Sequence, residues 1–89
     1  MYNYQIERPK LFTEDGSMTF LKIRDAAGEL VARSGAARMQ EILHHSRASG
    51  DSWFLLACVD RLVELKELRE IPQENRCGQH RIFVSTKHN

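Results

Sequence analysis

The closest approach to a metal site in the sequence is Cys77-x-x-His80, two ligand types close together in one polar segment. The remaining cysteine and histidines are scattered along the chain: Cys58, His44, His45 and His88. A zinc site needs four ligands, which two closely spaced pairs usually supply, and only one such pair is present. The sequence therefore predicts no metal site and no cofactor. Both cysteines are expected to be reduced, with a Cys58–Cys77 disulfide as the alternative.

The residues that serve as nucleophiles and acid–base catalysts lack the partners that catalysis requires. No Gly-x-Ser-x-Gly turn occurs, and no carboxylate is identifiable to orient a histidine beside the Cys77 thiol. Glu14 and Asp15 fall in a turn signal, and Glu64 and Glu67 fall on a polar helical face. Carboxylates in such places are expected to be solvated, so we predict that the protein is not an enzyme.

Two further sets of residues are suited to binding. Basic residues with the potential to contact nucleic-acid phosphates are Arg38, Arg47, Arg76, Arg81 and Lys87. A tryptophan among mixed charges is typical of a protein interface. That second candidate set is Trp53, Ala57, Asp60, Arg61 and Glu64. The alternative for Trp53 is a place in the core, because tryptophan is highly buried on average.

Composition places these residues in one small domain, 1–89. The 89 residues are 42% apolar and 28% charged, with a net charge of +1, and a chain of this length has room for one core. No apolar run suits a membrane span and no basic-then-apolar leader opens the chain, so we expect a cytoplasmic protein without a membrane partner. The near-neutral total excludes a strongly basic nucleic-acid protein, although the basic segments 33–50 and 72–89 flank an acidic segment, 51–71.

The first part of the chain, 1–35, is expected to be β-rich. Tyr2, Tyr4 and Ile6 alternate with polar residues, which is the period of a half-buried strand. Strand-forming residues on either side of the short loop 25–28 predict an N-terminal β-hairpin.

The alternative for this region is one helix over 18–33. Its apolar residues share a helical face, and Gly35 is a typical C-terminal stop. We favour the hairpin, because Gly28 in mid-helix costs about 1 kcal/mol.

The centre of the chain, 36–70, is predicted to be a helix-turn-helix. A first helix over about 36–47 carries Met39, Ile42 and Leu43 at helical spacing. A polar break at 49–52 precedes a second helix over about 52–68, which buries its apolar stripe. Segments 68–71 and 81–85 are strand-like and are expected to pair as an antiparallel hairpin, 68–85.

This arrangement over 36–85 resembles a winged-helix domain, in the broad style of the MarR-type regulators. The resemblance rests on Val59-Asp60-Arg61-Leu62-Val63-Glu64-Leu65, then Leu68-Arg69-Glu70-Ile71, the tip Glu74-Asn75-Arg76 and the return strand Arg81-Ile82-Phe83-Val84. Together with the hairpin expected for 1–35, this resemblance predicts an α+β, winged-helix-like fold in which the N-terminal hairpin precedes two helices and a C-terminal hairpin forms the wing. It further implies that the helix starting near Asp51 is a DNA-recognition helix and that the loop near Arg76 contacts DNA.

The charges of that helix favour a different use. At 100° per residue, the face opposite its apolar stripe presents Trp53, Ala57, Asp60 and Glu64. Acidic side chains have the wrong sign for phosphates, so any DNA contact shifts to the wing and the first helix. We therefore carry two hypotheses: a small DNA-binding transcriptional regulator, and an adaptor or inhibitor that binds a protein through the Trp53 face. A homodimer is compatible with either.

Overall fold

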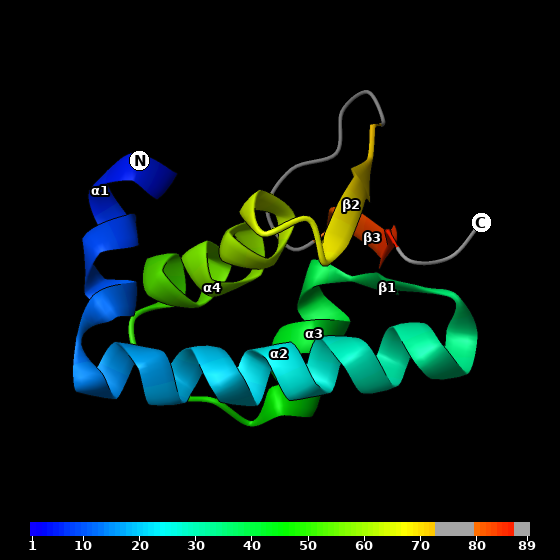
Figure 1. The fold of residues 1–89 in the computed structure, drawn as a ribbon, viewed down its shortest axis with the longest axis horizontal. Helices are drawn as coiled ribbons and strands as arrows, with labels where there is room; N and C mark the ends of the chain where they lie inside the picture. Colours follow the sequence, from blue (N-terminus) through cyan, green and yellow to red (C-terminus); the bar gives the residue numbers. More distant parts are fainter. Residues whose placement is uncertain (73–79, 87–89) are drawn as a thin grey trace.

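The computed structural model describes residues 1–72 and 80–86, and its fold is α+β (Figure 1). Within these residues, four α-helices and a short 3-10 helix accompany a three-stranded antiparallel sheet. In chain order the elements are α1 (Tyr4–Glu7), the 3-10 helix η1 (Arg8–Phe12), α2 (Glu14–Ser34), β1 (Ala36–Arg38), α3 (Met39–Ser46), α4 (Ser52–Glu64), β2 (Leu68–Ile71) and β3 (Ile82–Ser85). None of the helices in the described ranges has both the length and the apolar character of a membrane span.

The region expected to be β-rich, 1–35, is helical, so the predicted N-terminal hairpin is wrong and the helical alternative is correct in kind. Thr13 starts α2, because its side-chain oxygen accepts a hydrogen bond from the Gly16 N–H at 3.0 Å. Gly35 ends the helix with a left-handed φ of 82°, a conformation that glycine adopts without steric cost. Capping at both ends makes α2 longer than the predicted helix.

Burial explains why the helix prevails over the strand-forming residues of this segment. Ile23, Ala27 and Val31 recur at helical spacing and form the buried side of α2. Gly28 lies on the exposed side, so its helical cost is not increased by a packing defect. Gly16 is required in the first turn, because a Cβ there would lie 1.9 Å from the carbonyl oxygen of Lys10. The start of α2 therefore packs tightly against η1.

Residues 1–12, which we call the N-terminal arm, form no strand. Asn3 caps α1 by accepting a hydrogen bond from the Gln5 N–H at 2.9 Å. The alternation of Tyr2, Tyr4 and Ile6 has another cause: both tyrosines are half-buried, whereas Ile6 is exposed. In Figure 1 the arm stands at one end of α2, beside α4, and both helices of the arm contact α4.

The two helices predicted for the centre of the chain are present with shifted ends. The first three residues of the expected helix over 36–47 form β1 instead, and α3 starts at Met39. The second helix, α4, starts at Ser52 as predicted and stops at Glu64, short of 68. Lys66, with a left-handed φ of 64°, then turns the chain into β2.

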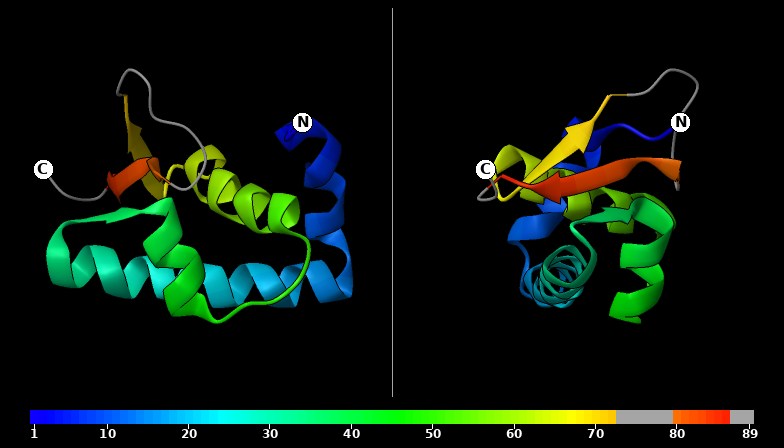
Figure 2. Two further views of the ribbon diagram at one scale, coloured as in Figure 1. Left: turned by 180° about the vertical axis from the view of Figure 1, so that it is seen from behind. Right: turned by 90° about the vertical axis from the view of Figure 1, so that its right-hand side faces the viewer.

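The sheet has the order β1-β3-β2, and both pairings are antiparallel. Segments 68–71 and 81–85 pair as predicted, with Glu70 opposite Phe83. On its other side, Phe83 lies opposite Ala37 of β1, a strand of three residues that the sequence did not predict. Figure 2 shows the sheet on one side of α2, with α3 beside that helix. The expected wing tip, 74–76, lies outside the described residues.

The core fills the space between α2, α3, α4 and the sheet. Its largest fully buried side chains are Phe83, Ile23, Met39, Ile42, Leu62, Val59 and Cys58. Trp53 is not among them, because 42% of its surface is exposed, so the alternative that placed Trp53 in the core is wrong.

Candidate functional site

The outward face of α4 was expected to be free for a partner, and the N-terminal arm covers it. Asp60 and Glu64 are one helical turn apart on this face, and Ala57 precedes Asp60 by three residues. Ala57 is fully buried, although the helical wheel predicted it to be exposed. Most of each acidic side chain is covered, and both accept hydrogen bonds from side chains in distant parts of the chain.

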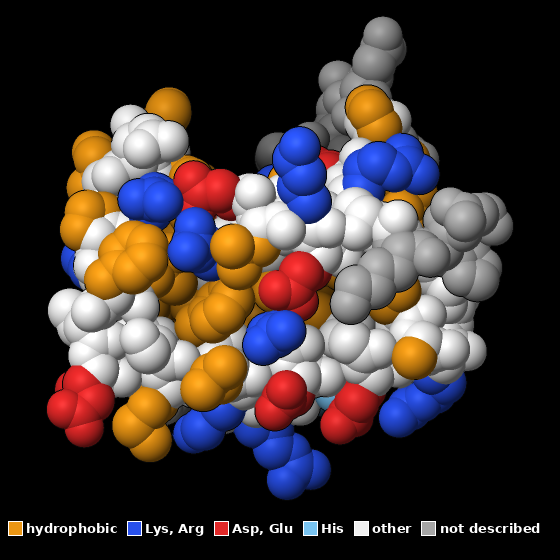
Figure 3. All heavy atoms as spheres, viewed as in Figure 1, with side chains coloured by type: hydrophobic (Ala, Val, Ile, Leu, Met, Phe, Trp, Pro, Cys, Tyr) orange, Lys and Arg blue, Asp and Glu red, His pale blue; other side chains and the backbone are white. Residues whose placement is uncertain are grey.

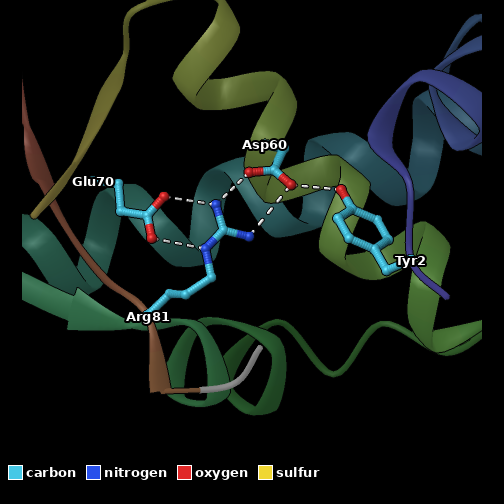
Figure 4. Close-up of polar contacts among 4 residues, drawn as sticks. All are labelled: Tyr2, Asp60, Glu70 and Arg81. Carbon is cyan, nitrogen blue, oxygen red and sulfur yellow. Dashed lines mark hydrogen bonds and ion pairs between the residues drawn. The ribbon is translucent and has the colours of Figure 1, made fainter. Parts of the chain in front are cut away.

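A polar network links Asp60 to three segments of the chain (Figure 4). The Tyr2 hydroxyl donates to one Asp60 carboxylate oxygen at 2.5 Å. Arg81 Nη2 donates to the other oxygen of Asp60 at 2.6 Å. The same guanidinium makes a two-pronged contact with Glu70, through Nη2 at 2.8 Å and Nε at 2.9 Å. The network therefore connects the arm, α4, β2 and the residue directly before β3.

Burial makes this network strongly electrostatic. Only 16% of the Arg81 side chain and 15% of the Asp60 side chain are exposed. Burial opposes the charge on Arg81, but the hydrogen bonds to Glu70 and Asp60 outweigh it and raise the Arg81 pKa above its ordinary value. Burial, followed by the hydrogen bond to Asp60, raises the pKa of Tyr2. At neutral pH a neutral phenol and a guanidinium thus hold Asp60.

A second network surrounds Glu64, one turn further along α4. Its carboxylate accepts hydrogen bonds from the Tyr4 hydroxyl at 2.6 Å, Arg61 Nη1 at 2.7 Å and Arg8 Nε at 3.0 Å. These contacts, led by the Tyr4 hydrogen bond, lower the pKa of Glu64 to about 2. Burial and the bond to Glu64 raise the pKa of Tyr4 to about 12. The guanidinium carbons of Arg8 and Arg61 also lie 5.1 Å and 5.2 Å from the centre of the Phe12 ring.

The predicted protein-interface set is therefore divided. Asp60 and Arg61 contact the arm through Tyr2 and Phe12, and Ala57 on the same helix is fully buried. Glu64 belongs to the same contact with about a third of its side chain exposed. Trp53, at the start of α4, remains open to solvent.

The predicted phosphate-binding set is not gathered into one patch within the described residues. Arg81 lies in the network with Asp60 and Glu70. Arg38 and Arg47 are exposed at opposite ends of α3, a helix about 12 Å long at 1.5 Å per residue. Arg38 is additionally paired with Glu41 at 3.6 Å. The other two members, Arg76 and Lys87, lie outside the described residues.

Large apolar side chains that lie open to solvent concentrate at the N-terminal end of the chain. In the described ranges these are Met1, Ile6, Phe12, Met18, Leu21, Trp53 and Leu65. Most belong to the first 21 residues, and Figure 3 shows hydrophobic side chains gathered over α1, η1 and the first half of α2. We call Ile6, Phe12, Met18 and Leu21 the apolar end. Their exposed fractions are 66%, 58%, 60% and 51%, an arrangement typical of contact with a protein.

Chemically reactive groups are not assembled in the part of the chain that the structure describes. Cys58 is buried, and burial raises its pKa to about 12, which leaves it an unreactive thiol. No group of three His, Cys, Asp or Glu side chains suited to a metal ion occurs in these residues. His45 Nε2 lies 2.8 Å from a Glu29 oxygen, which is a surface contact between α2 and α3. Cys77 lies outside the described residues.

Sequence reasoning missed the partners of α4. Tyr2 and Tyr4 were assigned to one strand and Glu70 to another, while Arg8 and Phe12 were assigned no role. A usable signal exists in the two acids at i and i+4, because an acidic pair opposite an apolar stripe requires cationic or hydroxyl partners when it is covered. Nothing in the sequence states that the partners come from nearly sixty residues away.

Comparison with known proteins returned no match: no family model fits the chain, and neither a curated protein nor a solved structure is similar to it.

Proposed function

We propose that this chain is a non-enzymatic winged-helix module that binds another protein. The order of elements supports the winged-helix part of the proposal. The pair α3–α4 has the place of a helix-turn-helix, and β2–β3 follows it as a wing would. Helix α2 supplies the preceding helix that such domains have and that the predicted hairpin would have lacked.

The charges of α4 support a protein partner over groove reading of DNA. A helix that reads a groove presents donors and basic residues to the bases and phosphates. Here the arm binds both outward acids, and Arg81 binds Asp60. The guanidinium group of Arg81, next to the proposed wing strand β3, is therefore already paired within the molecule. The arm would have to leave before α4 could enter a groove, and the uncovered acids would then repel phosphates.

The observation that carries the proposal is the apolar end. Monomeric soluble proteins rarely expose large contiguous apolar patches, and such patches commonly mark contact sites. Met18 and Leu21 are a single turn apart on α2, and Phe12 lies just before that helix. The interface is therefore assigned to the N-terminal end of the molecule, with Trp53 as the aromatic residue retained from the sequence hypothesis.

The test compares the wild type with a Met18→Ser/Leu21→Ser double variant, with Trp53→Ala and with Lys22→Ser as the matched control on α2. Oligomeric mass by light scattering and affinity capture are measured for each. We expect a bound protein, a second copy of this chain included, that the wild type and Lys22→Ser retain and the double variant loses. Identical masses and identical bound proteins for all four would contradict the proposal.

DNA binding is the second candidate function, favoured by one observation. Arg47 is exposed at the end of α3 and has no ion-pair or hydrogen-bond partner for its side chain among residues 1–72 and 80–86. A basic residue of that kind is suited to a phosphate contact. A duplex-binding assay at several salt concentrations with the wild type, Arg38→Ala, Arg47→Ala and Arg76→Ala tests it. Binding that weakens with salt and falls in these variants supports DNA, and no duplex binding at low salt removes it.

A further inference from the structure

A cavity opens between the second half of α2 and the point where α4 leads into the sheet. Its volume is about 530 Å³, within the range of about 300–1,000 Å³ typical of small-molecule sites. Ala27 and Val31 of α2 line one side, and Leu62 and Leu68 line the other. All four belong to the buried core, so the cavity is backed by a packed apolar wall.

Gly28 keeps this cavity open. It lies on the lining of the cavity, and a Cβ at its position would meet nothing within 4 Å. Glycine is the least favourable ordinary residue in a helix interior, at about 1 kcal/mol relative to alanine, and no positive φ requires it here. Space for a ligand gives this glycine a reason that the fold alone does not.

Two residues of opposite charge, Arg24 and Glu67, also line this cavity. Arg24 Nε donates to Glu67 Oε1 at 2.9 Å, and the side chains are 49% and 32% exposed. Within the part of the chain described, this is the one hydrogen bond either side chain makes. The two terminal nitrogens of Arg24 and the second oxygen of Glu67 thus remain available to a ligand.

The Arg24–Glu67 pair indicates which charged groups a ligand of this cavity must carry. A ligand with a carboxylate alone would satisfy Arg24 and leave Glu67 facing a negative charge. An amine alone would do the reverse. A molecule with both groups on one carbon, beside an apolar substituent, complements both charges and the wall at once. An exposed ion pair contributes little to stability. Breaking the Arg24–Glu67 pair to bind such a ligand therefore costs little free energy.

We propose that this cavity binds an apolar α-amino acid, with its carboxylate on Arg24, its ammonium group on Glu67 and its side chain against Val31, Leu62 and Leu68. This goes beyond the proposed function, because no residue of the apolar end lines the cavity and its occupant is a small molecule. Binding to the folded state alone would stabilise the fold by an amount that rises with the logarithm of the ligand concentration.

The test measures amide chemical shifts of the whole chain during titration with L-phenylalanine, 3-phenylpropanoate and 2-phenylethylamine. We expect saturable shifts in α2 and β2 with L-phenylalanine, and affinity at least about tenfold weaker for each one-charge analogue. If 3-phenylpropanoate bound with the same affinity as L-phenylalanine, the ligand would be a simple apolar acid, and the proposal would be overturned. No saturable shift with any of the three would overturn it as well.

Variants locate the site. Gly28→Leu places a side chain in the cavity and improves helix propensity, so it should keep the fold and abolish binding. Lys22→Leu, on an exposed part of the same helix outside the cavity lining, is the matched control and should bind as the wild type does. Arg24→Gln should weaken L-phenylalanine at least about tenfold and leave the phenylethylamine affinity unchanged. Undiminished binding by Gly28→Leu or by Arg24→Gln would contradict the assignment.

Discussion

The outward face of α4 and the apolar end differ in which kind of side chain is covered and which is exposed to solvent. On α4, Asp60 and Glu64 are side chains typical of a solvent-exposed surface, yet the arm binds both and Arg81 also binds Asp60. At the apolar end, Met18 and Leu21 are the kind that a core accepts, yet more than half of each is exposed. The polar side chains are thus used in contacts inside the molecule, and the apolar ones remain exposed, where we propose that a partner binds. The type of a residue alone did not reveal which surface of the molecule is covered and which is exposed.

The largest effect is expected from breaking the network at Arg81. Arg81→Met leaves Asp60 and Glu70 close together without their shared cation, so we expect the free energy of unfolding to fall by about 2–4 kcal/mol. Urea denaturation measures this, with Arg33→Met on the exposed side of α2 as the control. If Arg81 were a free phosphate contact, both variants would lie within about 0.5 kcal/mol of the wild type.

Gly16→Ala tests how the arm is anchored to α2. The new Cβ would meet the Lys10 carbonyl oxygen, which is backbone and cannot swing aside. We expect a loss of about 1–3 kcal/mol in the free energy of unfolding and faster hydrogen exchange at α1 and η1. Gly28→Ala is the matched control, since it meets nothing and should gain about 0.5–1 kcal/mol. Equal effects at the two glycines would show that the arm is not packed as described.

The contact at Glu64 predicts a pH dependence with a definite sign. Its pKa is lowered from 4.5 to about 2 by Tyr4, Arg61 and Arg8, so its stabilising effect is complete above about pH 4.5 and is lost as pH falls toward 2. Glu64→Gln should therefore be less stable than the wild type at neutral pH, and the two should converge in acid. Urea midpoints between pH 7 and pH 2 measure it. A difference that does not change with pH would contradict the contact.

The smallest effect on folding is expected at the apolar end. Leu21→Ser removes a side chain that is 51% exposed, so the free energy of unfolding should change by no more than about 0.5 kcal/mol. The loss should appear in partner binding instead, measured by capture against the wild type. A substantial loss of stability with unchanged binding would show that Leu21 contributes to the core and not to binding, and would contradict the prediction.

The sequence predicted local elements better than their partners. The strands 68–71 and 81–85 and the start of α4 carry signals within a few residues of each other, and those predictions are confirmed. The prediction of a hairpin in region 1–35 was wrong because this region carries both an alternating pattern and a helical spacing of apolar residues, and both are short-range signals. Two caps decide between them: Gly35, which the sequence offered as a helix stop, and Thr13, whose capping role was not predicted. The α4 face failed because Tyr2 and Asp60 are distant in sequence.

The most direct test of the covered α4 face is a nuclear Overhauser measurement between the Tyr2 ring and the Asp60 side chain in the folded wild-type chain. Cross-peaks are expected between the Tyr2 ring protons next to the hydroxyl and the Asp60 methylene, with matching peaks for Tyr4 and Glu64. Their persistence on dilution would show that each chain covers its own helix. An assigned spectrum with neither contact, and with the Ala57 methyl group open to solvent, would contradict the account.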